Sequence, residues 1–124
     1  MNAPLELAYL GDSVYETAVR AKLVREHSLT SKEYNARAFA LVNAPAQAKG
    51  VKLIEPLLSE EEANVLRKGR NAKGGNVPKK ATVAEYRTAT GLETLVGWLY
   101  WTGADDRLGE LMNIALKEGE EHGV

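Results

Sequence analysis

The sequence contains no cysteine, which excludes a disulfide framework and a metal site built from thiolates. No apolar run reaches the ~18–20 residues that a membrane-spanning helix needs. The first residues, Met1 to Pro4, lack the basic and apolar regions of a signal peptide. These absences predict a protein of the cytoplasm with no membrane partner.

A strong charge of one sign is also missing, because 16 Lys and Arg residues oppose 17 Asp and Glu residues. The net charge of −1 gives no global signal for a nucleic-acid partner, so any such signal must be local. Hydrophobic residues make up 44% of the 124 positions, which favours a globular domain with its own core. We therefore expect a single domain over residues 1–124.

Apolar residues recur with helical spacing along most of the chain, and no stretch alternates for long enough to predict a strand. Thr30 and Ser31 are candidate N-caps, Ser59 and Thr82 open capping boxes, and Pro45 suits a first helical turn. The sequence thus predicts an all-α fold. Its helices are expected at about 5–27, 31–42, 45–58, 59–70, 82–102 and 104–120, with a loop at 74–78.

Two acids, Asp12 and Glu93, lie at the edges of apolar helical stripes. A carboxylate beside apolar surface is costly unless it has a partner. Ala8 near Asp12 and Gly97 near Glu93 are small, which leaves room for a second helix or for an ion. Gly11, in the middle of the first helix, is expected to permit a close contact, because glycine otherwise weakens a helix.

Two interpretations of these acids stay open. Asp12 alone is explained by an ion pair with Arg20, Lys22 or a basic loop residue, and Glu93 alone by a salt bridge. If the two helices pack together, the pair instead forms a site for a hard cation such as Mg²⁺, which prefers carboxylate and water oxygens. Glu16 lies one turn after Asp12 on the same face and is a candidate for the outer shell of that site.

A local excess of positive charge lies between Glu62 and Glu85, where the sequence has no acidic residue. Six basic residues surround a Gly-Gly loop there: Arg67, Lys68, Arg70, Lys73, Lys79 and Lys80. A solvated helix end explains them, because cations complement a helix C-terminus, and so do contacts to nucleic-acid phosphates. Six charges within the 14 residues 67–80 of a near-neutral protein favour the second interpretation.

Several runs of residues resemble one enzyme family. Leu7–Val14 (LAYLGDSV) resembles the signature helix of the ribonuclease III family, and Leu92–Gly97 (LETLVG) resembles its second acidic helix. Further runs match in order and spacing: Asn43–Ala48 (NAPAQA), Arg67–Lys73 (RKGRNAK), Gly75–Lys79 (GNVPK) and Tyr86–Arg87. Together they resemble the Mini-ribonuclease III branch, a catalytic domain without a double-stranded-RNA-binding domain. The resemblance covers nearly the whole chain.

The resemblance implies that Asp12 and Glu93 are catalytic acids that bind Mg²⁺, with Mn²⁺ as a substitute. Full-length family members have two more acids, at positions that are Ala8 and Thr90 here. Water and substrate phosphate oxygens would then complete the coordination, as Mg²⁺ allows. The residues expected to bind RNA are Arg67, Lys68, Arg70, Asn71, Lys73, Lys79 and Lys80.

The resemblance further implies a homodimeric endoribonuclease that hydrolyses double-stranded RNA. The expected substrate is precursor 23S ribosomal RNA, and a large-subunit ribosomal protein is a candidate partner. Two other functions stay open. A catalytically silent RNA-binding member of the same fold would explain the two missing acids. A helical protein-interaction domain would explain the apolar surfaces but not the basic loop.

Overall fold

The computed structural model describes residues 3–72, 77 and 79–122, and every secondary-structure element of these residues is a helix. Their bounds are α1 (Pro4–Glu26), α2 (Ser31–Val42), α3 (Ala44–Ile54), the 3₁₀ helix η1 (Glu55–Leu57), α4 (Glu60–Asn71), α5 (Val83–Trp101) and α6 (Asp105–His122). The described residues contain no strand, so the predicted all-α fold is confirmed. Within these residues, no helix combines the length and apolar character needed to cross a membrane.

The predicted helix bounds agree with the structure to within about two residues, except after Ile54. There α3 ends early and η1 follows, because Pro56 lacks an amide hydrogen and its ring opposes the carbonyl group four residues earlier. Of the predicted loop at 74–78, only Val77 belongs to the described residues.

Side-chain caps fix the starts of four helices. Asn43 caps α3 by accepting a hydrogen bond from the amide of Ala46 at 2.9 Å. Capping boxes open α2, α4 and α5, and their pairs are Thr30 with Glu33, Ser59 with Glu62, and Thr82 with Glu85. Each box satisfies a backbone donor at both of its residues, so these starts follow from short local patterns.

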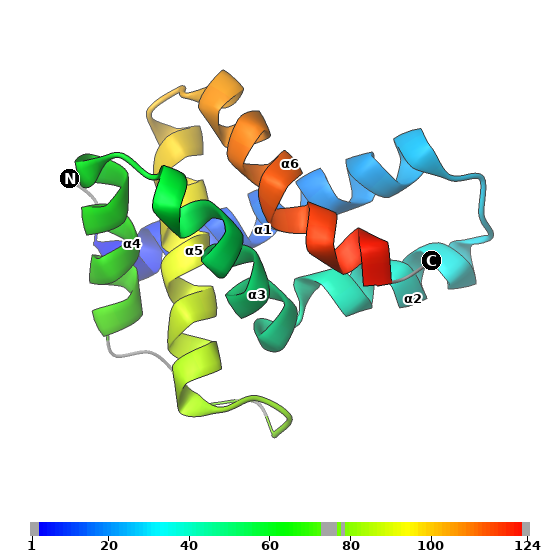
Figure 1. The fold of residues 1–124 in the computed structure, drawn as a ribbon, viewed down its shortest axis with the longest axis horizontal. Coiled ribbons are helices and arrows are strands. Elements are labelled where there is room, and N and C mark those ends of the chain that lie inside the picture. Colours follow the sequence, from blue (N-terminus) through cyan, green and yellow to red (C-terminus); the bar gives the residue numbers. More distant parts are fainter. Residues whose placement is uncertain (1–2, 73–76, 78, 123–124) are drawn as a thin grey trace.

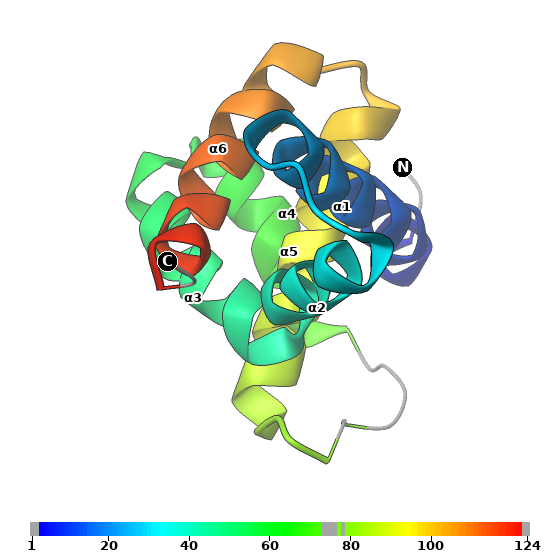
Figure 2. The ribbon, with the colours of Figure 1, turned by 90° about the vertical axis from the view of Figure 1, so that its right-hand side faces the viewer.

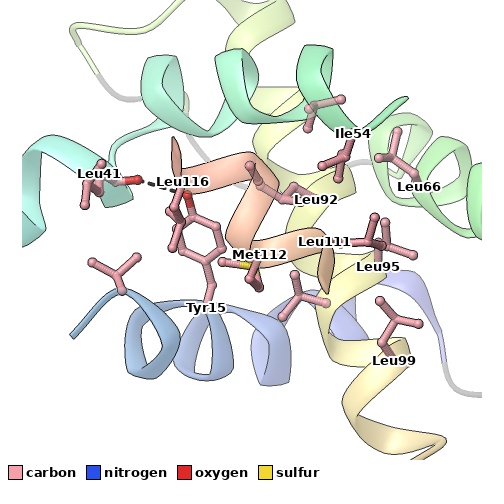
Figure 3. Packing of buried hydrophobic residues seen from close by; sticks show 14 of the residues in the cluster. Tyr15, Leu41, Ile54, Leu66, Leu92, Leu95, Leu99, Leu111, Met112 and Leu116 are labelled. Atoms are coloured by element: carbon pink, nitrogen blue, oxygen red, sulfur yellow. Dashed lines mark hydrogen bonds between the residues drawn. The ribbon is translucent and has the colours of Figure 1, made fainter. Parts of the chain in front are cut away.

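Helix α5 lies at the centre of the fold and packs against α1, α3, α4 and α6 (Figure 1). Leu92, Leu95 and Leu99 of α5 are buried in the core that the surrounding helices complete. Tyr15 lies among these residues, and its hydroxyl donates a hydrogen bond to the Leu41 carbonyl oxygen at 3.0 Å (Figure 3). This bond ties α1 to the end of α2.

Helices α1 and α5 cross at a point where each carries a glycine. A Cβ atom on Gly11 would lie 1.7 Å from the Glu93 carbonyl oxygen, and one on Gly97 would lie 1.9 Å from the Leu7 carbonyl oxygen. The predicted close contact at Gly11 is therefore confirmed. Because Asp12 follows Gly11, the crossing also brings Asp12 next to Glu93.

Candidate active site

The carboxyl groups of Asp12 and Glu93 meet at the crossing of α1 and α5, although they are far apart in the sequence. Asp12 is exposed, whereas Glu93 is half-buried. The two side chains are close enough for their polar atoms and negative charges to act on each other. The structure thus brings one acid from each of two packed helices into a single site.

The environment of Glu93 changes its proton affinity. Burial raises the pKa of Glu93 to about 8, and Asp12 contributes through its hydrogen bond and its negative charge. A hydrogen bond from Gln47 opposes this rise. Without a cation, the pair therefore keeps one proton near pH 7. Two adjacent carboxylates that repel each other fit a divalent cation, because a cation can take the place of the shared proton.

The basic residues nearest to Asp12 along α1 are paired with other acids. Arg20 pairs with Glu16 at 3.4 Å, and Lys22 pairs with Glu26 at 2.8 Å. In the described part of the chain, no ion pair involves either carboxyl group of the crossing. The interpretation of Asp12 as half of a structural ion pair with Arg20 or Lys22 is therefore not what the structure shows.

Full-length members of the family that the sequence resembles have two more acids, at the positions of Ala8 and Thr90. Neither of these residues supplies a carboxylate here. Ala8 is buried, and the Thr90 hydroxyl donates a hydrogen bond to the Tyr86 carbonyl oxygen at 3.0 Å. Among the described residues, no group of three or more His, Asp or Glu side chains is arranged to hold a metal ion. Glu16 pairs with Arg20 one turn beyond the site, and its outer-shell role stays a prediction.

A pocket of about 700 Å³ lies beside Glu93, between α2, α3, α5 and the segment that precedes α5. Lys79 and Lys80 line this pocket together with Glu93. In both ribbon views this segment lies at the opposite end of the molecule from the α5–α6 connection (Figures 1 and 2). Two of the basic residues predicted to bind RNA are thus beside the carboxyl pair.

The remaining basic residues lie elsewhere. Arg67 and Lys68 are exposed on α4, while Arg70 pairs with Glu55 at 3.2 Å. Arg70 and Asn71 line a separate groove of about 650 Å³ between α3, α4 and α5. Lys73 lies outside the described residues. The predicted RNA-binding segment is therefore divided between two surfaces.

Two pocket residues, Phe39 and Gln47, were not predicted from the sequence. Phe39 is 70% exposed, whereas Gln47 is only 2% exposed and contacts Glu93 through its side chain. The run Asn43–Ala48 indicates Gln47 only through its resemblance to a family. A polar residue between two alanines gives no sign of its partner, because that partner lies on α5.

Comparison with known proteins adds independent information. The model of the Ribonuclease III domain family matches residues 5–104. A Mini-ribonuclease 3 from Symbiobacterium thermophilum is 45% identical over 112 residues, which cover 90% of this chain and 86% of that protein. A second Mini-ribonuclease 3, from a Thermoanaerobacter species, is 40% identical over 96% of this chain and 84% of its own.

A solved structure shows the same architecture. The crystal structure of a Fusobacterium nucleatum protein matches with a TM-score of 0.84 and 31% sequence identity. The match covers 94% of this chain and 93% of the other. The helical arrangement described above is thus shared with an experimentally determined relative.

Proposed function

Because the chain belongs to the ribonuclease III family and, within it, to the Mini-ribonuclease 3 group, we propose that it is a metal-dependent endoribonuclease that cleaves double-stranded RNA. The observation that carries this proposal is the pairing of Asp12 with Glu93 beside a pocket lined by Lys79 and Lys80. The two carboxyl groups can bind a metal ion, and the neighbouring lysine side chains can bind phosphate. This combination is chemically consistent with phosphodiester hydrolysis.

In this proposal Asp12 and Glu93 are the protein ligands of Mg²⁺, or of Mn²⁺ in its place. The bound ion would supply a polarised water nucleophile and stabilise charge on the phosphate and the leaving oxygen. Asp12 is exposed and accessible to RNA, while half-buried Glu93 is held by its neighbours. With only two acids in the site, water and RNA phosphate oxygens complete the coordination.

The substrate is held through its phosphates. Lys79 and Lys80 contact the strand nearest to the carboxyl pair, while Arg67 and Lys68 extend the contact along α4. A-form RNA is read mainly by shape and backbone, which suits this basic surface. The proposed physiological substrate is precursor 23S ribosomal RNA, with a large-subunit ribosomal protein as partner. Residues 1–124 form one catalytic domain in this proposal.

A homodimer is part of the same proposal, and the exposed face of α1 supports it. Leu5 is 41% exposed and Tyr9 is 85% exposed, one helical turn apart and immediately before Asp12. A two-fold axis beside this face would bury both side chains and place two sites near one duplex. Light scattering at micromolar concentration measures the assembly, and a monomer there contradicts this part of the proposal.

A second candidate function is RNA binding without cleavage, and the residues Ala8 and Thr90 at family acid positions favour it. The carboxyl pair argues for catalysis, because two acids beside a phosphate-binding surface weaken binding unless a cation lies between them. Incubating the protein with structured precursor RNA, with and without Mg²⁺, separates the two functions: only the nuclease yields metal-dependent fragments.

The two acids are tested by Asp12→Asn and Glu93→Gln, which keep shape and remove charge. We expect each variant to lose roughly 100-fold or more in single-turnover cleavage of a duplex, because each removes a ligand of the ion. RNA binding should stay equal or improve slightly, and the double variant should be little worse than either single one.

A matched control for these variants is Glu26→Gln, which removes an exposed carboxylate near the end of the same helix, far from Asp12. It should keep cleavage within a few-fold of the parent. A thermal melt of every variant separates loss of chemistry from loss of fold. Near-parental cleavage by Asp12→Asn or Glu93→Gln removes that residue from the proposed site.

A further inference from the structure

Gln47 is a buried polar side chain in a mostly apolar part of α3. It is 2% exposed, and its sequence neighbours are Ala46 and Ala48. A buried amide is costly unless its donors and acceptor find partners. The polar neighbour of Gln47 is Glu93 on α5: both residues line the same pocket, and the Gln47 side chain stabilises the Glu93 carboxylate.

The chemistry of the two groups fixes the direction of this contact. Once a cation ionises Glu93, its carboxylate only accepts hydrogen bonds, so the Gln47 amide then turns its NH₂ group toward Glu93. Among the described residues, Asp12 from α1 and Gln47 from α3 both act on the Glu93 carboxyl group. Asp12 repels an ionised Glu93, whereas Gln47 stabilises it, so the two contacts differ in what they do to the site.

Helix α3 is held firmly enough to position this amide. Asn43 caps its first turn, and Val51 and Ile54 are buried in the core. A Cβ atom on Gly50 would lie 3.0 Å from the Ala115 carbonyl oxygen, so α3 packs closely on α6. Gln47 lies one turn after the cap, between this start and the close contact, which leaves its backbone little freedom to move.

We propose that Gln47 is a positioning residue of the active site: its amide fixes the Glu93 carboxylate so that one oxygen stays free to ligate the cation. This inference rests on the proposed function, because it presumes that Glu93 is a metal ligand. Outer contacts of this kind orient metal ligands in other proteins, and their loss typically weakens metal binding or activity ~10–100-fold.

The test measures Mn²⁺ binding to the protein without RNA, by electron paramagnetic resonance of the free ion. Gln47→Met has a similar shape and lacks the donor, and Gln47→Leu is a second apolar substitution in case the first misfolds. We expect ~10–100-fold weaker Mn²⁺ binding by either variant, with the helical content of the parent. In single-turnover cleavage, the Mg²⁺ concentration for half-maximal rate should rise by a similar factor.

A matched control is Thr94→Val, since Thr94 is a buried polar residue of α5 that is 1% exposed. Its hydroxyl donates to the carbonyl oxygens of Thr90 and Pro4 and to neither carboxyl group of the pair. This variant should lower the melting temperature and leave Mn²⁺ affinity unchanged. If Thr94→Val and Gln47→Met weakened Mn²⁺ binding equally, the loss of any buried polar group would be enough to disturb the site. That result would overturn the inference.

The outcomes also separate this inference from the proposed function. If the parent binds Mn²⁺, Asp12→Asn does not, and Gln47→Met binds as tightly as the parent, the positioning role of Gln47 is wrong and the metal site stands. If the parent itself binds no Mn²⁺, the metal site of the proposed function is wrong, and the role of Gln47 is wrong with it.

Discussion

Glu93 differs from an ordinary surface glutamate because partial burial, Asp12 and Gln47 act on it together. Burial and the charge of Asp12 favour the neutral acid, while the Gln47 amide favours the carboxylate. The first two effects prevail, so the metal-free protein keeps a proton there at neutral pH. A cation reverses this preference, because it attracts both carboxylates.

The raised pKa of Glu93 predicts how stability depends on pH when a chelator removes divalent cations. In the unfolded chain Glu93 loses its proton near 4.5, while in the folded protein it does so at about 8. The folded state therefore binds more protons in this window, and Glu93 lowers the free energy of unfolding as pH rises from about 4.5 to 8.

Glu93→Gln cannot ionise and isolates this effect. Near pH 4.5 the variant and the parent should melt at similar temperatures, whereas at pH 8.5 the variant should melt several degrees higher. Added Mg²⁺ should raise the melting temperature of the parent at pH 8.5 and leave that of the variant almost unchanged. A difference that stays constant across the pH range would show that Glu93 has an ordinary pKa.

At the scale of elements, the crossing of α1 and α5 sets the geometry of the site. Gly11 and Gly97 let the two backbones approach so closely that a side chain at either position would overlap a carbonyl oxygen. The same approach places Asp12 against Glu93, so packing and the carboxyl pair depend on the same two glycines.

Gly11→Ala should therefore damage stability and activity together. The new Cβ atom forces α1 and α5 apart, and we expect a loss of about 3 kcal/mol or more in the free energy of unfolding by urea. Cleavage by the remaining folded protein should also fall, because Asp12 moves away from Glu93. Parental stability of this variant would contradict the observed crossing.

Gly109→Ala on α6 is the matched control, since no atom lies within 4 Å of a Cβ atom there. Alanine is the better helix former at an open helical position by about 1 kcal/mol. This variant should thus be as stable as the parent or slightly more stable, with unchanged cleavage. The comparison separates overlap at the crossing from the general effect of replacing a helical glycine.

Element bounds were largely predictable from the sequence, because caps are local. Thr82 with Glu85 identifies the start of α5 from four residues, and Gly103, with φ of 78°, follows its end. The early end of α3 was missed because helical spacing continues past Ile54, and the effect of Pro56 on the preceding turn outweighs that pattern.

At the scale of the whole molecule, contacts between distant segments set the limit of prediction. Asp12 and Glu93 were identified, but periodicity could not show that their helices cross; only resemblance to a family joined them. Gln47 was missed, because its partner on α5 becomes visible only in the fold. The basic segment was predicted as one surface, yet Arg70 lines a different groove from Lys79 and Lys80.

This division of the basic residues predicts unequal roles in RNA binding. Lys79 and Lys80 line the pocket of Glu93, so their replacement by alanine should remove two phosphate contacts. Each contact releases counterions, and the slope of log affinity against log salt concentration should flatten by about 1–2. Binding should be measured with a duplex in the Glu93→Gln background, which prevents cleavage.

The matched control replaces Lys32 and Lys117, which are exposed on α2 and α6 and do not line that pocket, so the net charge changes by the same amount. If net charge alone governed binding, both double variants would flatten the slope equally, and the assignment of Lys79 and Lys80 would be wrong. If Lys79 and Lys80 contact RNA directly, only their replacement should flatten the slope, because counterions are released only where a phosphate meets a protein cation.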